Sequence, residues 1–304
     1  MLKVINQSPI NCVHISPLDF ARLGLLAAIW GASFIAMRAS VPELGTLLAT
    51  IGRVSLAAIA LVLFSHLNKI PLQWKRHYRA YFLAGLFGAA LPFALFSYAA
   101  HYLPAALSAL LNATCPLFGA LFSMLWLAEK LSARKLIGLL LGLAGVWMLV
   151  GARSLFANNP TSLSLIACLL GPACFAISGV VIKYYSCSKK ENRIEPLAMA
   201  TGSMVAASLI LLPALPFSLP AQFPSYPAIG LVAALALFPS AFAQIIFIPL
   251  VARIGPTRAM SVSFLIPLFS MIWGFLFLDE VIGISCVLGG FAVLAATGLV
   301  VKTD

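Results

Sequence analysis

Ten long apolar runs separated by short polar breaks constrain the fold of this chain more than any other feature. They extend approximately over 20–38, 44–66, 80–101, 104–127, 133–151, 162–184, 196–216, 227–251, 257–278 and 281–301. A helix of about 20 residues crosses a hydrocarbon core about 30 Å thick, and the runs match that length. Because they are continuous rather than alternating, they predict membrane-spanning helices and not the strands of a barrel.

The composition agrees with a lipid environment. The 304 residues are 62% hydrophobic and only 9% charged, and the mean hydropathy is +1.05, whereas soluble domains carry about 25% charged residues. We therefore predict an all-α polytopic membrane protein whose surroundings are the lipid bilayer. The formal charge of +11 lies in the breaks between spans, which favours an orienting role and argues against a nucleic-acid partner.

Lysine and arginine predict the orientation. If the N-terminus is cytoplasmic, sixteen basic residues lie on the inner side and only Arg38 and Arg153 on the outer side. Basic residues accumulate in cytoplasmic loops, so both termini are expected in the cytoplasm. The predicted location is the plasma membrane, or the inner membrane if the source is a bacterium.

An internal repeat divides the chain. Pro-Leu-Phe at 116–118 opens an apolar run that ends at Glu129, and Pro-Leu-Phe at 267–269 opens one that ends at Glu280, with the same offset of 151 positions. An odd number of spans in each half would invert the second half, which is typical of transporters with a central site. The expected segments are an N-terminal cytoplasmic tail (1–19), a first five-helix repeat (20–151), a linker (152–161), a second, inverted five-helix repeat (162–301) and a C-terminal tail (302–304).

With these motifs the chain resembles the ten-helix EamA-type family of the drug/metabolite transporter superfamily. The resemblance is carried by Trp-Gly-Ala-Ser-Phe at 30–34, Arg53, the segments 116–129 and 267–280, and the glycines that follow them. It implies a basket of ten helices around a central cavity lined by spans 1, 3, 4, 6, 8 and 9, with spans 5 and 10 at the periphery. It also implies transport of small organic metabolites, often the export of amino acids.

Few polar residues lie at mid-depth, and aromatic residues accompany them, as in a small-ligand pocket. The candidate substrate-binding residues are Trp30, Ser33, Phe93, Tyr98, Asn112, Phe175, Ser178, Gln244, Ser263 and Phe264. Asn112 can both donate and accept hydrogen bonds, which suits a zwitterionic group, and Ser263 occupies the matching position in the other repeat. Helix packing is the alternative role for each of them.

Five further residues are expected to act in structure or movement. Pro116 and Pro267 interrupt backbone hydrogen bonding at matched depths and are candidate hinges. Glu129 and Glu280 end their spans, where a carboxylate can meet the positive end of a helix; gating or substrate binding is the alternative. Arg53, in the middle of span 2, is expected to pair with a neighbouring helix, or alternatively with a substrate carboxylate.

Other functions find little support. Aspartate and glutamate are missing from the middle of the spans, so proton coupling is not expected, and facilitated diffusion or exchange is. The six cysteines form no CxxC pair, and HExxH and GxSxG motifs are missing, so we predict no catalytic residues, metal or cofactor. An intramembrane enzyme remains the alternative of another class, and a translocase of lipid-linked or nucleotide sugars is the rival within the fold. The expected partner is a small-molecule substrate, and the expected state is a monomer, with a homodimer as the alternative.

Overall fold

The computed structural model describes residues 15–103, 105–129, 132–150, 162–186, 193–220, 223–278 and 284–301, and the regular elements within them are all helical. By length and composition, seven helices in these ranges can cross a membrane. They are Pro17–Met37, Ala39–Leu67, Trp74–Tyr102, Ser108–Leu127, Ser162–Ser186, Pro196–Phe217 and Tyr226–Ile254. Val287–Val301 is a shorter apolar helix.

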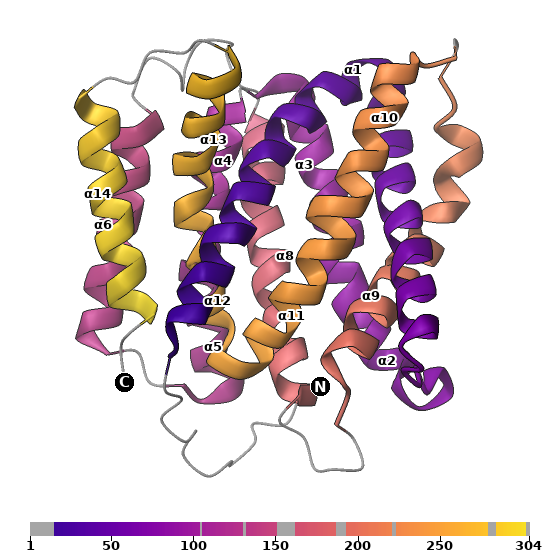
Figure 1. Ribbon diagram of the computed structural model, residues 1–304, viewed down its shortest axis with the longest axis horizontal. Helices are drawn as coiled ribbons and strands as arrows, with labels where there is room; N and C mark the ends of the chain where they lie inside the picture. The colour runs from indigo at the N-terminus through magenta and orange to yellow at the C-terminus, as the bar shows by residue number, and fades with distance from the viewer. Residues whose placement is uncertain are drawn as a thin grey trace.

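The first two predicted spans form one helical element, α1 (Pro17–Leu67), that turns back on itself near the top of Figure 1. The turn occurs at Gly45, whose φ of 75° and ψ of 163° lie outside the helical region. Only glycine adopts a positive φ without steric cost. The expected break at 39–43 is therefore replaced by helix, and a single residue reverses the chain.

A π-helical turn interrupts each of the third and eighth predicted spans. In the third span, η1 (Leu86–Ala90) lies between α2 (Trp74–Gly85) and α3 (Leu91–Tyr102). In the eighth, η3 (Ala236–Phe242) lies between α10 (Tyr226–Leu235) and α11 (Ala243–Ile254). The two π turns begin 150 positions apart, close to the offset of the sequence repeat. Such turns insert an extra residue and frequently mark functional sites.

The fourth and ninth predicted spans are each divided into two helices. They are α4 (Ala105–Asn112) with α5 (Cys115–Leu127), and α12 (Pro256–Met260) with α13 (Val262–Leu278). Pro116 lies in the first turn of α5, directly after the first break, whereas Pro267 lies inside the continuous helix α13. The two matched prolines therefore have different local environments.

Segments from the two halves of the chain interlock. The part of α1 before Gly45 packs on α13. In this contact, Trp273 Nε1 donates to the Ala28 carbonyl (2.9 Å), and Ser270 Oγ donates to the Gly31 carbonyl (3.1 Å). A Cβ at Gly31 would lie 3.0 Å from the Ser270 backbone nitrogen, so glycine permits this close approach.

Two further contacts join the halves. The helix α8 (Ser162–Ser186) packs on α3 and α5, and the part of α1 after Gly45 packs on α9 (Pro196–Leu211). The hydroxyls of Ser65 and Thr201 lie 2.6 Å apart across the latter contact. A short 3₁₀ helix, η2 (Leu212–Phe217), follows α9.

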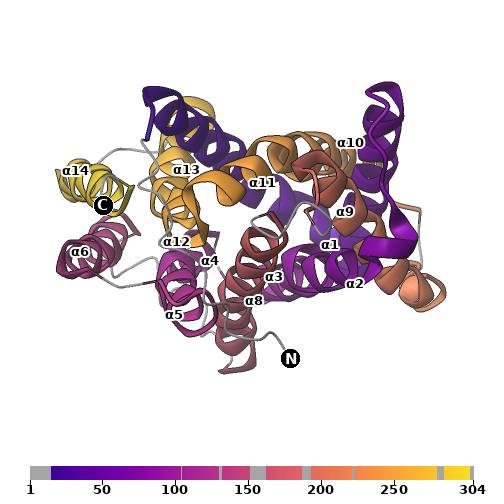
Figure 2. The same ribbon diagram turned by 90° about the horizontal axis from the view of Figure 1, so that it is seen from below.

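The helices α6 (Ala133–Val150) and α14 (Ile284–Val301) pack on each other at one edge of the bundle, as both views show (Figures 1 and 2). They correspond to predicted spans 5 and 10, and the edge position agrees with the expected peripheral role. In Figure 1, α1 begins and α14 ends at the same lower side of the molecule.

Candidate functional site

A cavity of about 100 Å³ lies among segments from both halves of the chain. Eight of the ten candidate substrate-binding residues line it. They are Trp30, Ser33, Phe93, Asn112, Phe175, Ser178, Gln244 and Ser263. Both π turns contribute to the wall, through Gly88 and Ala89 of η1 and through Pro239 of η3.

The other two candidates, Tyr98 and Phe264, lie outside the lining. Tyr98 packs its ring against Tyr102 near the end of α3, with 5.2 Å between the ring centroids. Phe264 is fully buried, and its ring faces Gly142 of α6. Consecutive residues of a helix point about 100° apart, so the register that turns Ser263 toward the cavity turns Phe264 toward α6.

Trp30 is held in the wall of the cavity by the π turn of the opposite half. Its Nε1 donates to the Pro239 carbonyl at 2.9 Å, and its ring meets that of Phe247 edge to face, with centroids 5.1 Å apart. Ser178 Oγ likewise donates to the Ala84 carbonyl, just before η1, at 3.1 Å. Side chains that line the cavity thus tie α1 to the π turn η3 and α8 to the end of α2, just before η1.

Asn112 and Ser263 meet around Cys115. The Cys115 thiol lies 3.5 Å from Asn112 Oδ1 and also contacts the Ser263 hydroxyl. Asn112 and Ser263 are each 5% exposed, so this polar group is nearly dry. Cys115 was not among the candidates, although it follows Asn112 by three residues, across the break between α4 and α5.

Arg53 also lines the cavity, which corrects the expectation that span 2 lies outside it. Its Nε donates to Ser240 Oγ at 2.6 Å, and Ser240 Oγ donates to the Leu235 carbonyl at 2.8 Å. The guanidinium carbon lies 3.9 Å from the centroid of the Phe93 ring, a cation–π distance. The long side chain reaches from α1 to the region between η3 and the start of α3.

The described lining of the cavity is largely apolar, includes six aromatic side chains and carries one charge. Its ring-bearing lining residues are Trp30, Phe34, Phe93, Phe96, Phe175 and Phe247. Arg53 is the charged member of the lining. Among the described residues, no group of three or more His, Cys, Asp or Glu side chains is placed to hold a metal ion.

Of the two glutamates that were expected to act in structure, one lies away from the cavity and the other lies outside the described residues. Glu129 follows the end of α5, where Ala128 has a φ of 53°, and a Cβ at Gly255 would lie 3.4 Å from its Oε1. It therefore lies beside the start of α12. Glu280 lies outside the described residues.

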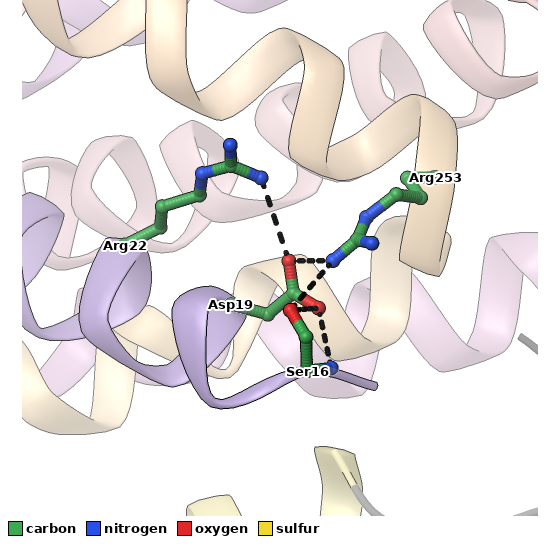
Figure 3. Close-up of polar contacts among 4 residues, drawn as sticks. All are labelled: Ser16, Asp19, Arg22 and Arg253. Atoms are coloured by element: carbon green, nitrogen blue, oxygen red, sulfur yellow. Dashed lines mark hydrogen bonds and ion pairs between the residues drawn. The ribbon is translucent and has the colours of Figure 1, made fainter. Parts of the chain in front are cut away.

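A second polar cluster joins the start of α1 to the end of α11 (Figure 3). Asp19 has a fully buried side chain, forms an ion pair with Arg253 of α11, and lies 3.6 Å from Arg22 of its own helix. Its Oδ2 accepts from the backbone nitrogen and the hydroxyl of Ser16 at 2.9 and 3.0 Å. Nearby, Lys183 Nζ donates to the Ala252 carbonyl at 2.7 Å. These contacts join α1, α8 and α11 at the end of the bundle at which α1 begins.

Comparisons with known proteins agree with this architecture. The EamA-like transporter family matches residues 22–151 and 162–302. An uncharacterized transporter of Bacillus subtilis, YvbV, is 26% identical over 280 residues, which cover 91% of this chain and 90% of the relative. The uncharacterized inner membrane transporter YedA of Escherichia coli K12 is 29% identical over 263 residues, covering 84% and 81%.

Two further similarities extend over most of the chain. A probable terminal-alkyne amino-acid exporter of Streptantibioticus cattleyicolor is 23% identical over 282 residues, covering 91% of each chain. A solved crystal structure superimposes with a TM-score of 0.74 at 18% identity, covering 91% of this chain and 94% of the other; it supports the fold alone. The names of these relatives indicate transporters rather than enzymes.

Proposed function

Because the chain belongs to the EamA-like transporter family, we propose that it moves amino acids or related small metabolites across the plasma membrane by alternating access. The proposed direction is export, and the proposed membrane of a bacterial source is the inner one. The observation that carries the proposal is the aromatic cavity that both halves of the chain line together. A site between two halves that can rock is what alternating access needs.

The proposed architecture has ten helices in two inverted repeats, with both termini in the cytoplasm. Matched features of the two halves support it: the π turns η1 and η3, the broken spans 4 and 9, and the edge pair α6 and α14. Arg22, Lys183 and Arg253 lie close together, around Asp19 and the end of α11, as the basic-residue rule requires of residues on one side.

The cavity chemistry favours a small amphipathic substrate. Asn112, Ser263 and Gln244 offer neutral hydrogen-bonding groups among aromatic walls, a combination that orients a small ligand. The similarity to a protein named as a probable amino-acid exporter adds weight to amino acids. Translocation of lipid-linked or nucleotide sugars remains the alternative, and it would favour further basic residues in the cavity for phosphate. An enzyme within the membrane has no supporting observation.

Transport into liposomes of purified protein tests the proposal. Radiolabelled amino acids should enter liposomes preloaded with the unlabelled compounds, with no pH difference imposed, because the described residues that line the cavity include no carboxylate. Fluorescent lipid-linked sugars, assayed in parallel, should stay in their original leaflet. Movement of the sugars but not of the amino acids would reverse the assignment, and a strict need for a proton gradient would contradict the proposed exchange.

A further inference from the structure

Arg53 carries a charge into the cavity without a counter-ion from the described part of the chain. The described ion pairs both involve Asp19 at the end of the bundle, and the described residues that line the cavity include no acid. Arg53 is 7% exposed, so little water reaches the guanidinium group to stabilise its charge in place of a counter-ion. Charged residues within membrane spans typically pair with one another or mark a substrate pathway.

The contacts of Arg53 hold the guanidinium by one edge and leave the other edge available. Nε donates to Ser240 and the flat face lies on Phe93. An arginine has five N–H donors, and the four on the two Nη atoms make no hydrogen bond to the described residues. Two Nη groups side by side match the two oxygens of a carboxylate, which they bind through parallel hydrogen bonds.

The position of this free edge is set by the π turn η3 and by the start of α3, which follows η1. Ser240 belongs to η3, and Phe93 follows η1 by three residues. Ser240 is itself oriented by its bond to the Leu235 carbonyl. The arginine is thus positioned by segments from both halves of the chain, which are the parts that alternating access would move relative to each other.

The rest of the cavity complements an acid with an apolar body. Among the described lining residues, the polar ones other than Arg53 are neutral, and the walls are mainly apolar, with six aromatic side chains. From the described lining, a substrate ammonium group would meet neutral acceptors such as Asn112 Oδ1 and the faces of aromatic rings, whereas a carboxylate would meet a full positive charge. The carboxylate is therefore the group that this site selects most strongly.

We infer that Arg53 binds the carboxylate of the transported substrate, and that the substrate is an organic acid with an apolar or aromatic body whose α-amino group is dispensable. This inference rests on the proposed transport function and narrows its substrate class. Ser240 is a positioning residue that presents the guanidinium.

Binding of matched probes tests the inference without requiring transport. The melting temperature of the detergent-purified protein is measured against increasing 3-phenylpropionate and against its neutral counterpart 3-phenylpropanamide. The acid should stabilise the wild type and the amide should not. Arg53→Met should weaken binding of the acid by about ten- to hundredfold, the range expected for a lost hydrogen-bonded charge pair.

Further variants separate specific binding from general effects. Arg76→Gln removes an exposed arginine and should leave acid binding unchanged. Arg53→Lys keeps the charge but loses the planar fork, and Ser240→Ala frees the guanidinium; both should weaken acid binding several-fold, and both carry the test if Arg53→Met does not fold. A wild type that binds neither probe or both equally would overturn the inference, as would Arg53 and Ser240 variants that bind the acid like the wild type.

A transport arm distinguishes this inference from the proposed function. Unlabelled 3-phenylpropionate should inhibit the uptake of radiolabelled L-phenylalanine into liposomes. Unlabelled L-phenylalaninamide should not inhibit it. Equal competition by the amide would overturn the role of Arg53 and leave the transport function standing. Acid binding that depends on Arg53, together with a failure to move any amino acid, would uphold the carboxylate site and overturn amino-acid transport.

Discussion

The ion pair between Asp19 and Arg253 should contribute measurably to stability, whereas the contact between Asp19 and Arg22 should not (Figure 3). Both arginines approach the same buried carboxylate, and their exposures are similar, 41% for Arg253 and 39% for Arg22. They differ in what they join. Arg253 connects the start of α1 to the end of α11, whereas Arg22 is three residues from Asp19 on one helix.

The magnitude follows from burial and from the partners that remain. Removing one partner of a fully buried pair costs about 3–5 kcal/mol. Arg253 is partly exposed, and Asp19 keeps its two bonds from Ser16, so solvent and the helix cap reduce the cost of Arg253→Gln to about 1–3 kcal/mol. Arg22→Gln removes a local, exposed contact at 3.6 Å, which is worth about 0.2–0.5 kcal/mol.

Double-mutant cycles measure the two couplings separately. The free energy of unfolding is obtained by reversible denaturation with SDS in mixed micelles for Asp19→Asn, each arginine variant and each pair. We expect a coupling of about 1–3 kcal/mol for Asp19 with Arg253 and of under about 0.5 kcal/mol for Asp19 with Arg22. Additive effects of Asp19→Asn and Arg253→Gln, or equal couplings for the two arginines, would refute the argument.

Two further predictions concern topology and packing. In a variant whose native cysteines are replaced by serine, single cysteines at Asn68 and Leu219 should react with impermeant maleimide from opposite sides of the membrane, with Asn68 cytoplasmic; labelling from one side only would contradict the proposed topology. Gly85→Ala puts a methyl group 2.3 Å from the Ser203 carbonyl oxygen and should lower the free energy of unfolding by about 1–3 kcal/mol. Gly24→Ala meets no atom within 4 Å and should raise it by about 0.5–1 kcal/mol; the same sign for both in SDS denaturation would show that packing does not decide the outcome.

Hydropathy and repeat spacing predicted much of the helical framework, because a lipid-exposed helix must be apolar along its whole length. They also selected residues such as Trp30 and Asn112 that the structure brings together around one cavity. Few polar groups lie at mid-depth, so the polar residues there were informative. The roles of these residues in substrate binding remain predictions.

The features that escaped prediction depend on tertiary contacts. A π turn adds one residue to a helix without interrupting the apolar run. The hydropathy of the sequence therefore does not reveal η1 and η3. The break at Ser261, just before α13, sets which of Ser263 and Phe264 faces the cavity, and sequence spacing could not fix it. Arg53 reaches the cavity because its side chain is long and Ser240 lies opposite it. The serine that follows Pro239 in the middle of a span was the available clue.

The central claim is that substrate passes through the cavity lined by Trp30 and Asn112, and exchange by cavity variants tests it most directly. Uptake of a labelled amino-acid panel into preloaded liposomes is compared for the wild type, Trp30→Ala, Asn112→Ala and Tyr102→Ala, the last changing an exposed residue outside the lining. Loss of one hydrogen bond in a nearly dry site costs about 1 kcal/mol or more. We predict that the two cavity variants exchange several-fold more slowly than wild type and Tyr102→Ala, at equal folded yield. Exchange at the wild-type rate by both Trp30→Ala and Asn112→Ala, for every amino acid that the wild type moves, would contradict the claim.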